Sequence, residues 1–402
     1  MSNLRYLQLI NPGKCDFTHE ELKVLEASAG SSFYLFDAGR LQKNIKDLKE
    51  MLGAKAELCF SMKANPWLAK EAGRWADYLE ICSPGELRRC LRERIDPKKM
   101  VLDGLMKTEE EVVSAIRHGV QRISVDSMGQ MELVGRIAKE AGEDVHVLLR
   151  LSCGNQFGME EEEIIRIIGD YRRDNNITIE GLHYYSGTQK KNSSEIAAEF
   201  EQLDHRIGKI ERESGYSIKT LEIGGGAGVP YFREEAQERY EDVWDVIMEK
   251  ISCLSERLHI VYEAGRIVAA PAGVYITKVM ECKRRKGREI LILDGGMHHL
   301  SYFGQIAGRK TPFIQVVSDG EYGEEEVTLC GSLCTAQDIL AKNICVKGAV
   351  KGTYIIFQLT GAYSVTECCS EFLSRAKPAL LMKTDHGELS VLRDRERIEF
   401  DD

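Results

Sequence analysis

Short apolar runs alternate with longer amphipathic stretches between residues 33 and 272 of this chain. The intervening segments, such as residues 108–118 and 127–141, carry apolar residues three and four positions apart with charges between them. That spacing is typical of amphipathic helices, whereas the short runs are typical of strands. After an opening segment at residues 33–36, the runs lie at residues 58–60, 78–81, 100–102, 123–125, 145–149, 179–183, 220–223 and 259–262. Eight strands alternating with helices predict a parallel sheet closed into a (β/α)8 barrel.

The pattern changes after residue 272. Strand-like runs at residues 274–279, 290–293, 313–317 and 354–357 are separated mostly by turns. We therefore expect an N-terminal segment, residues 1–32, that joins a β domain, then a barrel over residues 33–272 and a C-terminal mainly-β domain over residues 273–402. The predicted fold class is α/β, a TIM barrel with an added β domain.

Composition narrows the classes of function. The 402 residues include 54 basic and 64 acidic side chains, and the net charge of −10 argues against a nucleic-acid or anionic-membrane partner. No apolar run approaches the roughly 20 residues that a membrane helix needs, and the N-terminus lacks the apolar core of a signal peptide. The twelve cysteines lack metal-site spacing, so we expect reduced thiols, no metal and a cytoplasmic location.

Unusual residues follow several of the predicted strands, where barrel enzymes place their active sites. Lys63 follows the first run, and a buried lysine is costly unless it is paired or chemically used; an exposed loop lysine is the alternative. Gly224–Gly226 follows the seventh run, and Gly265 and Arg266 follow the eighth. Glycines let backbone N–H groups approach an anion, and Thr188 could complete such a cradle, although a plain tight turn also explains the glycines.

Nine motifs occur in order between about Phe33 and Pro378. They are Phe60–Asn65, Ser83–Leu87, Asn155–Gly158, His183–Gln189, Gly224–Gly226, Glu263–Arg266, Asp294–Met297, Gly331–Cys334 and Gly361–Tyr363. Together they resemble the fold-type III pyridoxal-phosphate decarboxylases, which include diaminopimelate, ornithine and biosynthetic arginine decarboxylases. The resemblance implies an alanine-racemase-like fold, pyridoxal 5′-phosphate as cofactor, and α-decarboxylation of an amino acid with release of CO₂.

The resemblance also implies roles for single residues. Lys63 would form the Schiff base with the cofactor, and Glu263 would keep the pyridine nitrogen protonated, which makes the ring a better electron sink. Cys334 would reach the cofactor of a partner subunit and reprotonate the product, so the site would be complete only in a head-to-tail homodimer. A buried small hydrophobe is the other interpretation of Cys334. The implied phosphate contacts are Gly224, Gly225, Gly226, Gly265, Arg266 and Tyr363, with Thr188 as a hydroxyl donor.

Several positions depart from the family pattern. Tyr185 stands where the family usually has a histidine stacked on the cofactor, and tyrosine can stack equally well; His183 aligns with a variable position. Thr335 replaces the acidic residue that holds the distal amine in diaminopimelate and ornithine decarboxylases. A neutral hydroxyl cannot supply the charge-assisted hydrogen bond that an ammonium group needs.

A second departure follows Met297, where diaminopimelate enzymes continue to an arginine that binds a carboxylate. This chain has His298 and His299 instead, which could contact a distal carboxylate or be a surface pair. Gln156 replaces the family's lysine, although the aspartate that this lysine faces across the dimer is present as Asp338. The candidate substrate contacts are Arg150, His298, His299, Thr335 and Asp338.

Both features that bind a free diamino acid are therefore missing, which favours an amino acid carried in a conjugate, such as a siderophore precursor or a carrier-protein-linked amino acid. Decarboxylation of diaminopimelate, of another free diamino acid or of a D-amino acid is the alternative. A racemase is disfavoured because those enzymes place an arginine at the pyridine nitrogen, where this chain has Glu263. A non-catalytic carrier of the cofactor would lack the β domain, and an inactive regulatory homologue would be expected to lose Lys63 and the glycines.

Overall fold

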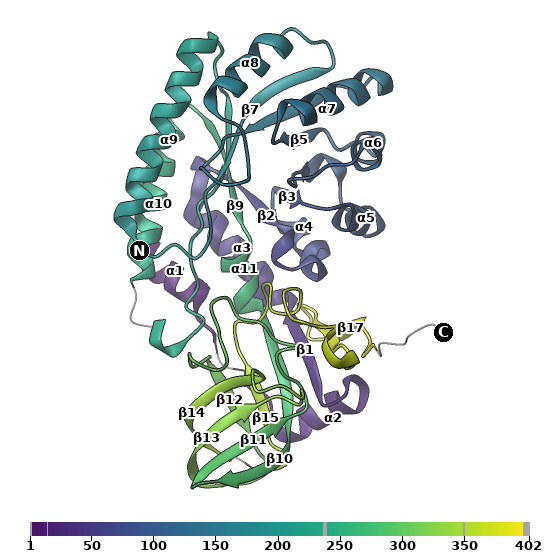
Figure 1. Cartoon of the computed structure of the whole chain (residues 1–402), viewed down its shortest axis with the longest axis vertical. Helices are drawn as coiled ribbons and strands as arrows, with labels where there is room; N and C mark the ends of the chain where they lie inside the picture. The colour runs from purple at the N-terminus through teal and green to yellow at the C-terminus, as the bar shows by residue number, and fades with distance from the viewer. Residues whose placement is uncertain (1, 14, 236–238, 349, 397–402) are drawn as a thin grey trace. The chain divides into compact units, whose positions relative to one another are not determined.

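The computed structural model describes residues 2–13, 15–235, 239–348 and 350–396. The chain divides into two compact units, which Figure 1 allows the reader to follow by colour. The first unit comprises Met1–Gln8, Ile45–Gly228 and Arg239–Gly265, and the second comprises Leu9–Asn44, Val229–Glu238 and Arg266–Asp402. These bounds differ from the expected division at residues 32 and 272. Residues 33–44, expected in the barrel, belong to the second unit, and the first eight residues belong to the first.

The first unit is the predicted closed barrel of eight parallel strands, which is confirmed. Its strands are β2 (Glu57–Ser61), β3 (Tyr78–Ile81), β4 (Met100–Leu102), β5 (Arg122–Val125), β6 (Val145–Arg150), β7 (Ile177–Tyr185), β8 (Thr220–Gly224) and β9 (His259–Ala264). The helices between them are α4 (Ala69–Trp75), α5 (Pro84–Arg92), α6 (Glu109–Arg117), α7 (Met128–Ala141), α8 (Glu161–Tyr171), α9 (Ser193–Ser214) and α10 (Tyr240–Leu254).

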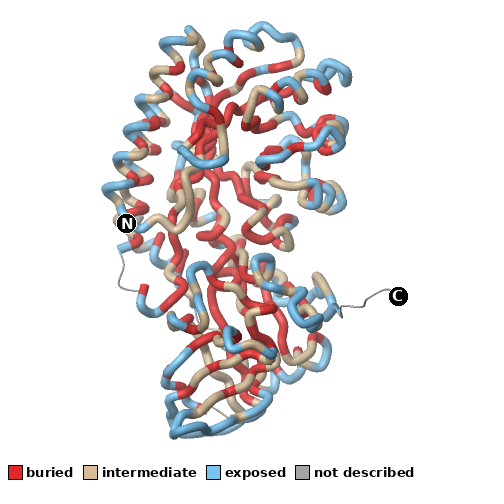
Figure 2. The backbone as a smooth tube through the Cα atoms, in the orientation of Figure 1, coloured by how far each residue is buried: buried red, intermediate tan, exposed pale blue. Residues whose placement is uncertain are grey.

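Local sequence explains where the barrel helices begin and which face they bury. The Ser83 hydroxyl accepts the Glu86 N–H at 3.2 Å and caps α5, and Thr108 and Ser127 cap α6 and α7 in the same way. Each such cap contributes about 1 kcal/mol. Along the outer helices buried positions alternate with exposed ones, whereas the strands that they cover are mostly buried, with exposed residues only near the start of β7 and β9 (Figure 2). This pattern fixes the strand ends, and therefore the residues that follow them, at the barrel mouth.

The second unit contains the predicted mainly-β domain, also confirmed. Its nine-stranded sheet runs in the order β14-β13-β11-β10-β1-β16-β17, with β15 paired to β10 and β12. The strands are β1 (Ser32–Asp37), β10 (Gly273–Arg285), β11 (Arg288–Leu293), β12 (Ile314–Val317), β13 (Glu324–Cys330), β14 (Ile339–Lys347), β15 (Tyr354–Phe357), β16 (Ala379–Lys383) and β17 (Leu389–Arg393). The opening segment at residues 33–36 is therefore a strand of this sheet, since β1 pairs with β10 and β16.

Four further α-helices lie within the residues that the structure describes. They are α1 (Ser2–Ile10), α2 (His19–Ala29), α3 (Ala38–Leu52) and α11 (Arg266–Ala269). Leu22 and Leu25 of α2 pack on the apolar face of the β sheet with Phe33, Leu35 and Ile276. Within the described ranges, no helix has both the length and the apolar character needed to cross a lipid bilayer.

Candidate active site

Lys63 lies just beyond the end of β2, in a single 3₁₀ turn formed by Met62–Ala64. Its ammonium group pairs with the carboxylate of Glu80, and Nζ lies 5.3 Å from the centre of the Tyr185 ring. Burial alone lowers the pKa of Lys63, but the neighbouring acidic groups, Glu80 foremost, raise that pKa well above its ordinary value. The alternative of an exposed loop lysine is wrong, because this side chain is held among charged groups and an aromatic ring.

Glu80 is a site residue that the sequence reasoning missed. It lies on β3 and is 0% exposed. Burial raises the pKa of Glu80, and the ion pair with Lys63 opposes that effect. The available signal was a single carboxylate inside the apolar run Tyr78–Ile81, since an acidic residue in a buried strand needs a partner.

Glu263 and His183 form the centre of a buried row of alternating charges. His183 Nε2 lies 2.8 Å from Glu263 Oε1, and both residues are buried. Burial raises the pKa of Glu263, but the charges of His183 and Lys63 outweigh it and lower that pKa. Burial lowers the pKa of His183, yet Asp103 and Glu263 together raise it to about 9. The geometry therefore holds Glu263 as a carboxylate and His183 as an imidazolium.

Asp103 and Arg150 extend the same row. Asp103 directly follows β4, with Oδ1 3.6 Å from His183 Nδ1 and Oδ2 3.5 Å from Arg150 Nη1. Arg150 Nη1 also lies 3.7 Å from Asp126 Oδ1, and the guanidinium lies 4.5 Å from the Phe157 ring. Arg150 is thus paired with two aspartates, and its contact with a substrate stays a prediction.

The glycine run after β8 leaves no room for side chains. Gly226 has φ +68°, a left-handed conformation that disfavours other residues, and a Cβ on Gly265 would lie 2.9 Å from Ala64 Cβ. A Cβ on Gly224 would collide with the Tyr185 ring. Bare backbone at the ends of β8 and β9 fits a phosphate cradle, because N–H groups can then approach an anion directly. The residues present therefore fit pyridoxal phosphate: a lysine, a buried carboxylate and a cradle.

Tyr185 is the last residue of β7, and Thr188 lies in the loop that follows it. Burial raises the pKa of the Tyr185 phenol, and a hydrogen bond with the Thr188 hydroxyl opposes that rise. Tyr185 lies close to Lys63, as a residue that stacks on the cofactor must. Direct contacts of Tyr185 and Thr188 with the cofactor stay predictions.

Two predicted phosphate ligands meet in the second unit. The Arg266 guanidinium lies 4.4 Å from the Tyr363 ring centre, and Arg266 Nη1 donates a hydrogen bond of 2.7 Å to the Tyr231 hydroxyl. Tyr363 has φ +63°, which is uncommon for a residue with a side chain. The structure brings Arg266 and Tyr363 together, and their contact with a phosphate group stays a prediction.

Cys334 and Thr335 lie in the loop formed by residues 331–338 of the second unit. Cys334 is exposed, so its interpretation as a buried small hydrophobe is wrong. Asp338 is buried and accepts the backbone N–H groups of Met297 at 2.7 Å and Leu333 at 2.9 Å. Asp338 therefore organises this loop from within, whereas Cys334 is presented on its surface.

His298 and His299 are buried, with exposed fractions of 1% and 2%, so the expectation of a surface pair is wrong. His299 contacts the Tyr275 hydroxyl at 3.0 Å and the Ala376 carbonyl at 2.7 Å. Burial lowers the pKa of His298 to about 3 and that of His299 to about 4, which leaves both rings neutral at neutral pH. A neutral, enclosed pair is poorly suited to bind a substrate carboxylate.

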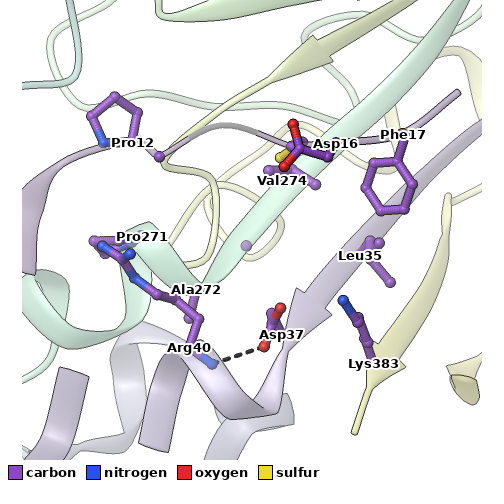
Figure 3. Close-up of a pocket in the computed structure, with 13 residues that line it drawn as sticks. Pro12, Asp16, Phe17, Leu35, Asp37, Arg40, Pro271, Ala272, Val274 and Lys383 are labelled. Atoms are coloured by element: carbon purple, nitrogen blue, oxygen red, sulfur yellow. Dashed lines mark hydrogen bonds between the residues drawn. The ribbon is translucent and has the colours of Figure 1, made fainter. Parts of the chain in front are cut away.

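The second unit also has a cavity of about 290 Å³, drawn in Figure 3. Its charged groups include Asp37 and Arg40. Asp37 Oδ1 accepts the Arg40 backbone N–H at 2.8 Å, and the Arg40 guanidinium donates to the carbonyls of Leu9 and Asn11, both at 3.2 Å. These contacts fasten the N-terminal segment and the start of α3. We therefore place the candidate active site at the barrel strand ends and not at this cavity.

Comparison with known proteins identifies the family of this chain. The sequence profile of the family described as "Pyridoxal-dependent decarboxylase, pyridoxal binding domain" matches residues 38–270. Over 399 residues the chain is 27% identical to the L-glutamyl-[BtrI acyl-carrier protein] decarboxylase of Niallia circulans, with 93% of each protein covered. It is 26% identical over 384 residues to the 2-[(L-alanin-3-ylcarbamoyl)methyl]-2-hydroxybutanedioate decarboxylase of Staphylococcus aureus, covering 88% of this chain and 94% of that protein.

The solved structures support the same fold. Diaminopimelate decarboxylase of Helicobacter pylori, crystallised with L-lysine, superposes with a TM-score of 0.80 at 23% sequence identity. The match covers 93% of this chain and 96% of that chain. At this identity the likeness concerns the fold, a barrel with an added β domain.

Proposed function

Because this chain belongs to the pyridoxal-dependent decarboxylases, we propose that it removes the α-carboxylate from an amino acid carried in a conjugate. The enzyme is a pyridoxal-phosphate-dependent carboxy-lyase, and the proposal concerns its substrate and the residues that act on it. The conjugate would be a siderophore precursor or an amino acid linked to a carrier protein. The two relatives described above support a conjugate, because one is named for a glutamyl group on an acyl-carrier protein and the other for an alanine joined through a carbamoyl group to a hydroxybutanedioate.

The barrel residues suit the cofactor in three ways. Lys63 would attach it covalently, Glu263 would face its pyridine nitrogen, and the bare backbone at Gly224–Gly226 and Gly265 would hold its phosphate. When bound, the cofactor withdraws electrons from the α-carbon and stabilises the negative charge that remains after CO₂ leaves. Before Lys63 can act as a nucleophile, its ammonium group must give up a proton, and the paired carboxylate of Glu80 lies beside that proton.

Cys334 would return a proton to the product from its Sγ, in a head-to-tail homodimer in which each subunit completes the site of the other. Its exposure supports this role, because a cysteine that serves another subunit must lie on the surface of its own. Tyr185 would stack on the cofactor ring, and Arg266 with Tyr363 would assist in binding the phosphate.

The observation that carries the substrate proposal is the arrangement of the loop after Cys334. Among residues 331–338, all described by the structure, Asp338 is the only carboxylate. Asp338 is buried and already accepts two backbone hydrogen bonds. Thr335 occupies the position next to Cys334 and carries no charge. This loop therefore offers no exposed acid for the ammonium group of a free diamino acid, whereas an acylated distal nitrogen needs none.

A substrate panel tests the proposal. We would measure CO₂ release by the cofactor-loaded protein from diaminopimelate, ornithine, lysine, arginine and glutamate. The same assay would use diaminopropionate and glutamate with the distal group acylated. We expect release from the acylated compounds and little from the free diamino acids. Rapid release from a free diamino acid would contradict the proposal, and exchange of the α-proton without release would indicate a racemase.

A Thr335→Glu variant sharpens the test. It restores an acid next to Cys334, so we expect turnover of a free diamino acid to rise relative to the acylated compounds. Ala336→Glu is the matched control, since it adds the same charge at the neighbouring exposed position. Equal effects of the two variants would show that position 335 does not select the substrate.

A further inference from the structure

We propose that His183 is a positioning residue that keeps Glu263 ionised and directed at the pyridine nitrogen of the cofactor. This inference deepens the proposed function and rests on it for the role of Glu263. His183 aligns with a variable position of the family, so the sequence assigned no role to it. In the structure it lies in the barrel interior and is 1% exposed.

The contacts of His183 divide between two sides of the imidazole ring. Nε2 lies 2.8 Å from Glu263 Oε1, and Nδ1 lies 2.9 Å from the Ser124 hydroxyl. Asp103 Oδ1 lies 3.6 Å from the same Nδ1. The Ser124 hydroxyl fixes the Nδ1 side of the ring by a hydrogen bond, and Nε2 is in close ionic contact with one oxygen of the Glu263 carboxylate.

The other oxygen of Glu263 lies toward the glycine run. Oε2 is 3.3 Å from the point where a Cβ on Gly224 would lie, and Gly224 pairs with Glu263 in the register of β8 and β9. Nε2 of His183 therefore makes a close ionic contact with Oε1, while Oε2 lies beside the bare backbone where the cofactor is expected. A carboxylate that is already in place needs no reorganisation when the cofactor binds. Preorganised groups in a buried site therefore stabilise a nearby charge more strongly.

A second buried glutamate on the neighbouring strand provides an internal comparison. Glu222 is 1% exposed and faces the same interior, but Cys59 is the hydrogen-bonding side chain beside it. Burial, together with the charge of Glu263, raises the pKa of Glu222 to about 8. Glu263 is equally buried, yet its pKa is lowered by His183 and Lys63. His183 also lowers the pKa of Glu222, but burial and the charge of Glu263 outweigh it there, whereas Glu263 lies 2.8 Å from Nε2 of the imidazolium.

The charges around His183 explain why its own proton stays in place. Asp103 and Glu263 are the two acids that act most strongly on it, Arg150 opposes them, and Glu222 faces it from β8. Loss of the imidazolium would leave Asp103 and Glu263 as two buried like charges, and one of them would then take up a proton. A protonated Glu263 could not pair with a positively charged pyridine ring.

The direct test is ¹⁵N NMR of the holoenzyme loaded with ring-¹⁵N-labelled pyridoxal phosphate. In the wild-type protein we expect a protonated pyridine nitrogen at neutral pH. In His183→Gln, which keeps a hydrogen-bond donor but loses the charge, we expect that protonated signal to be lost. We also expect kcat to fall by about 10- to 100-fold. This is the loss typical of mutating residues that orient the ligands of a metal site, which act in a comparable way. An unchanged pyridinium signal in His183→Gln would overturn the proposal.

Two control variants define the full loss and the full retention of the pyridinium signal. Glu263→Gln should lose the pyridinium signal outright, because it removes the acid itself. His259→Gln should leave the signal as in wild type. His259 lies on the same strand as Glu263 and also has Nε2 2.8 Å from a glutamate, Glu57, but its side chain is 46% exposed.

A measurement on the wild-type holoenzyme keeps the proposal testable if His183→Gln does not fold. With ¹⁵N-labelled histidine, His183 should carry a proton on both ring nitrogens at neutral pH and titrate near its pKa of about 9. Its signal is identified by through-space contacts with Ser124. A neutral His183 at neutral pH would refute the proposal. Neither NMR readout uses a substrate, so failure of the conjugate hypothesis would leave both results interpretable.

Discussion

Two buried histidine sites in this protein have opposite protonation states. In the barrel, His183 lies between Glu263 and Asp103, and these carboxylates raise its pKa to about 9. In the β unit, His298 and His299 are equally enclosed, but burial lowers their pKa values to about 3 and 4. All three side chains are at most 2% exposed. Burial alone therefore does not decide the charge of a histidine; the neighbouring acids do.

The difference distinguishes buried groups suited to catalysis from buried groups that belong to a structural core. The barrel interior holds several ionised groups close together beside Lys63, an arrangement that is costly for folding and typical of active sites. The β unit instead keeps its two adjacent histidines neutral, and His299 is hydrogen-bonded as in an ordinary core.

Lys63→Ala should abolish decarboxylation, because it removes the group that would bind the cofactor covalently and the cation that pairs with Glu80. The measurement is CO₂ release together with the visible absorbance of the bound cofactor. Lys46→Ala is the matched control, since the Lys46 ammonium also lies over an aromatic ring, 4.1 Å from that of Trp75. Retained activity in Lys63→Ala would contradict the assignment of the active site.

Glu263→Gln and Glu222→Gln test which buried carboxyl of the barrel must be charged. Glu263→Gln should reduce kcat by about 10²–10³-fold, as removal of a preorganised electrostatic group does. Glu222→Gln should have a much smaller effect, because burial already favours the neutral form of Glu222. Equal losses in the two variants would show that the charge of Glu263 is not the reason for its importance.

The two histidine sites should respond to pH with opposite slopes. His183 has a raised pKa, so its contribution to stability is complete below about 6.5 and is lost as the pH rises toward 9. His299 has a lowered pKa, so its contribution is complete above about 6.5 and is lost as the pH falls toward 4. The slope is about 1.4 kcal/mol per pH unit for each histidine.

Amide hydrogen exchange measured across this pH range in peptides from each unit would resolve the two slopes. His183→Gln should flatten the alkaline slope in the barrel, and His299→Gln should flatten the acidic slope in the β unit. Slopes of the same sign in both units would contradict the comparison.

The smallest effect is expected at His259, where a histidine–glutamate pair is exposed. His259 Nε2 lies 2.8 Å from Glu57 Oε2, with exposed side-chain fractions of 46% and 44%. Water screens such a pair, so His259→Gln should change the free energy of unfolding by about 0–1 kcal/mol. Chemical denaturation checks this value. A larger loss would show that distance, rather than burial, controls these pairs.

The barrel strands could be predicted from sequence because each is a short apolar run between amphipathic helices. In the β unit the same approach missed β13, β14, β16 and β17. Strand β13 begins with three exposed glutamates, Glu324–Glu326, so its first half has no apolar face. The placement of β1 in the β sheet could not be predicted either, because its pairing with β16 joins segments more than three hundred residues apart. Local patterns carry no signal of such pairing.

The site could be predicted in part. Lys63 and the glycine run follow predicted strands, and the resemblance supplied Glu263. The sequence reasoning missed Glu80 and Asp103 and gave His183 no role, because the importance of each depends on neighbours from other strands. Glu80 and Asp103 could have been identified from sequence, because each is a carboxylate within or directly after an apolar strand. The burial of His298 and His299 had no comparable local signal.

We propose that Lys63 binds pyridoxal phosphate at the mouth of the barrel. The most direct test is to load the protein with the cofactor, reduce the covalent link with borohydride, and locate the modified residue by mass spectrometry of the digest. We predict a pyridoxyl group on Lys63. A pyridoxyl group on another lysine, such as the buried Lys107, or none on Lys63 would contradict the account.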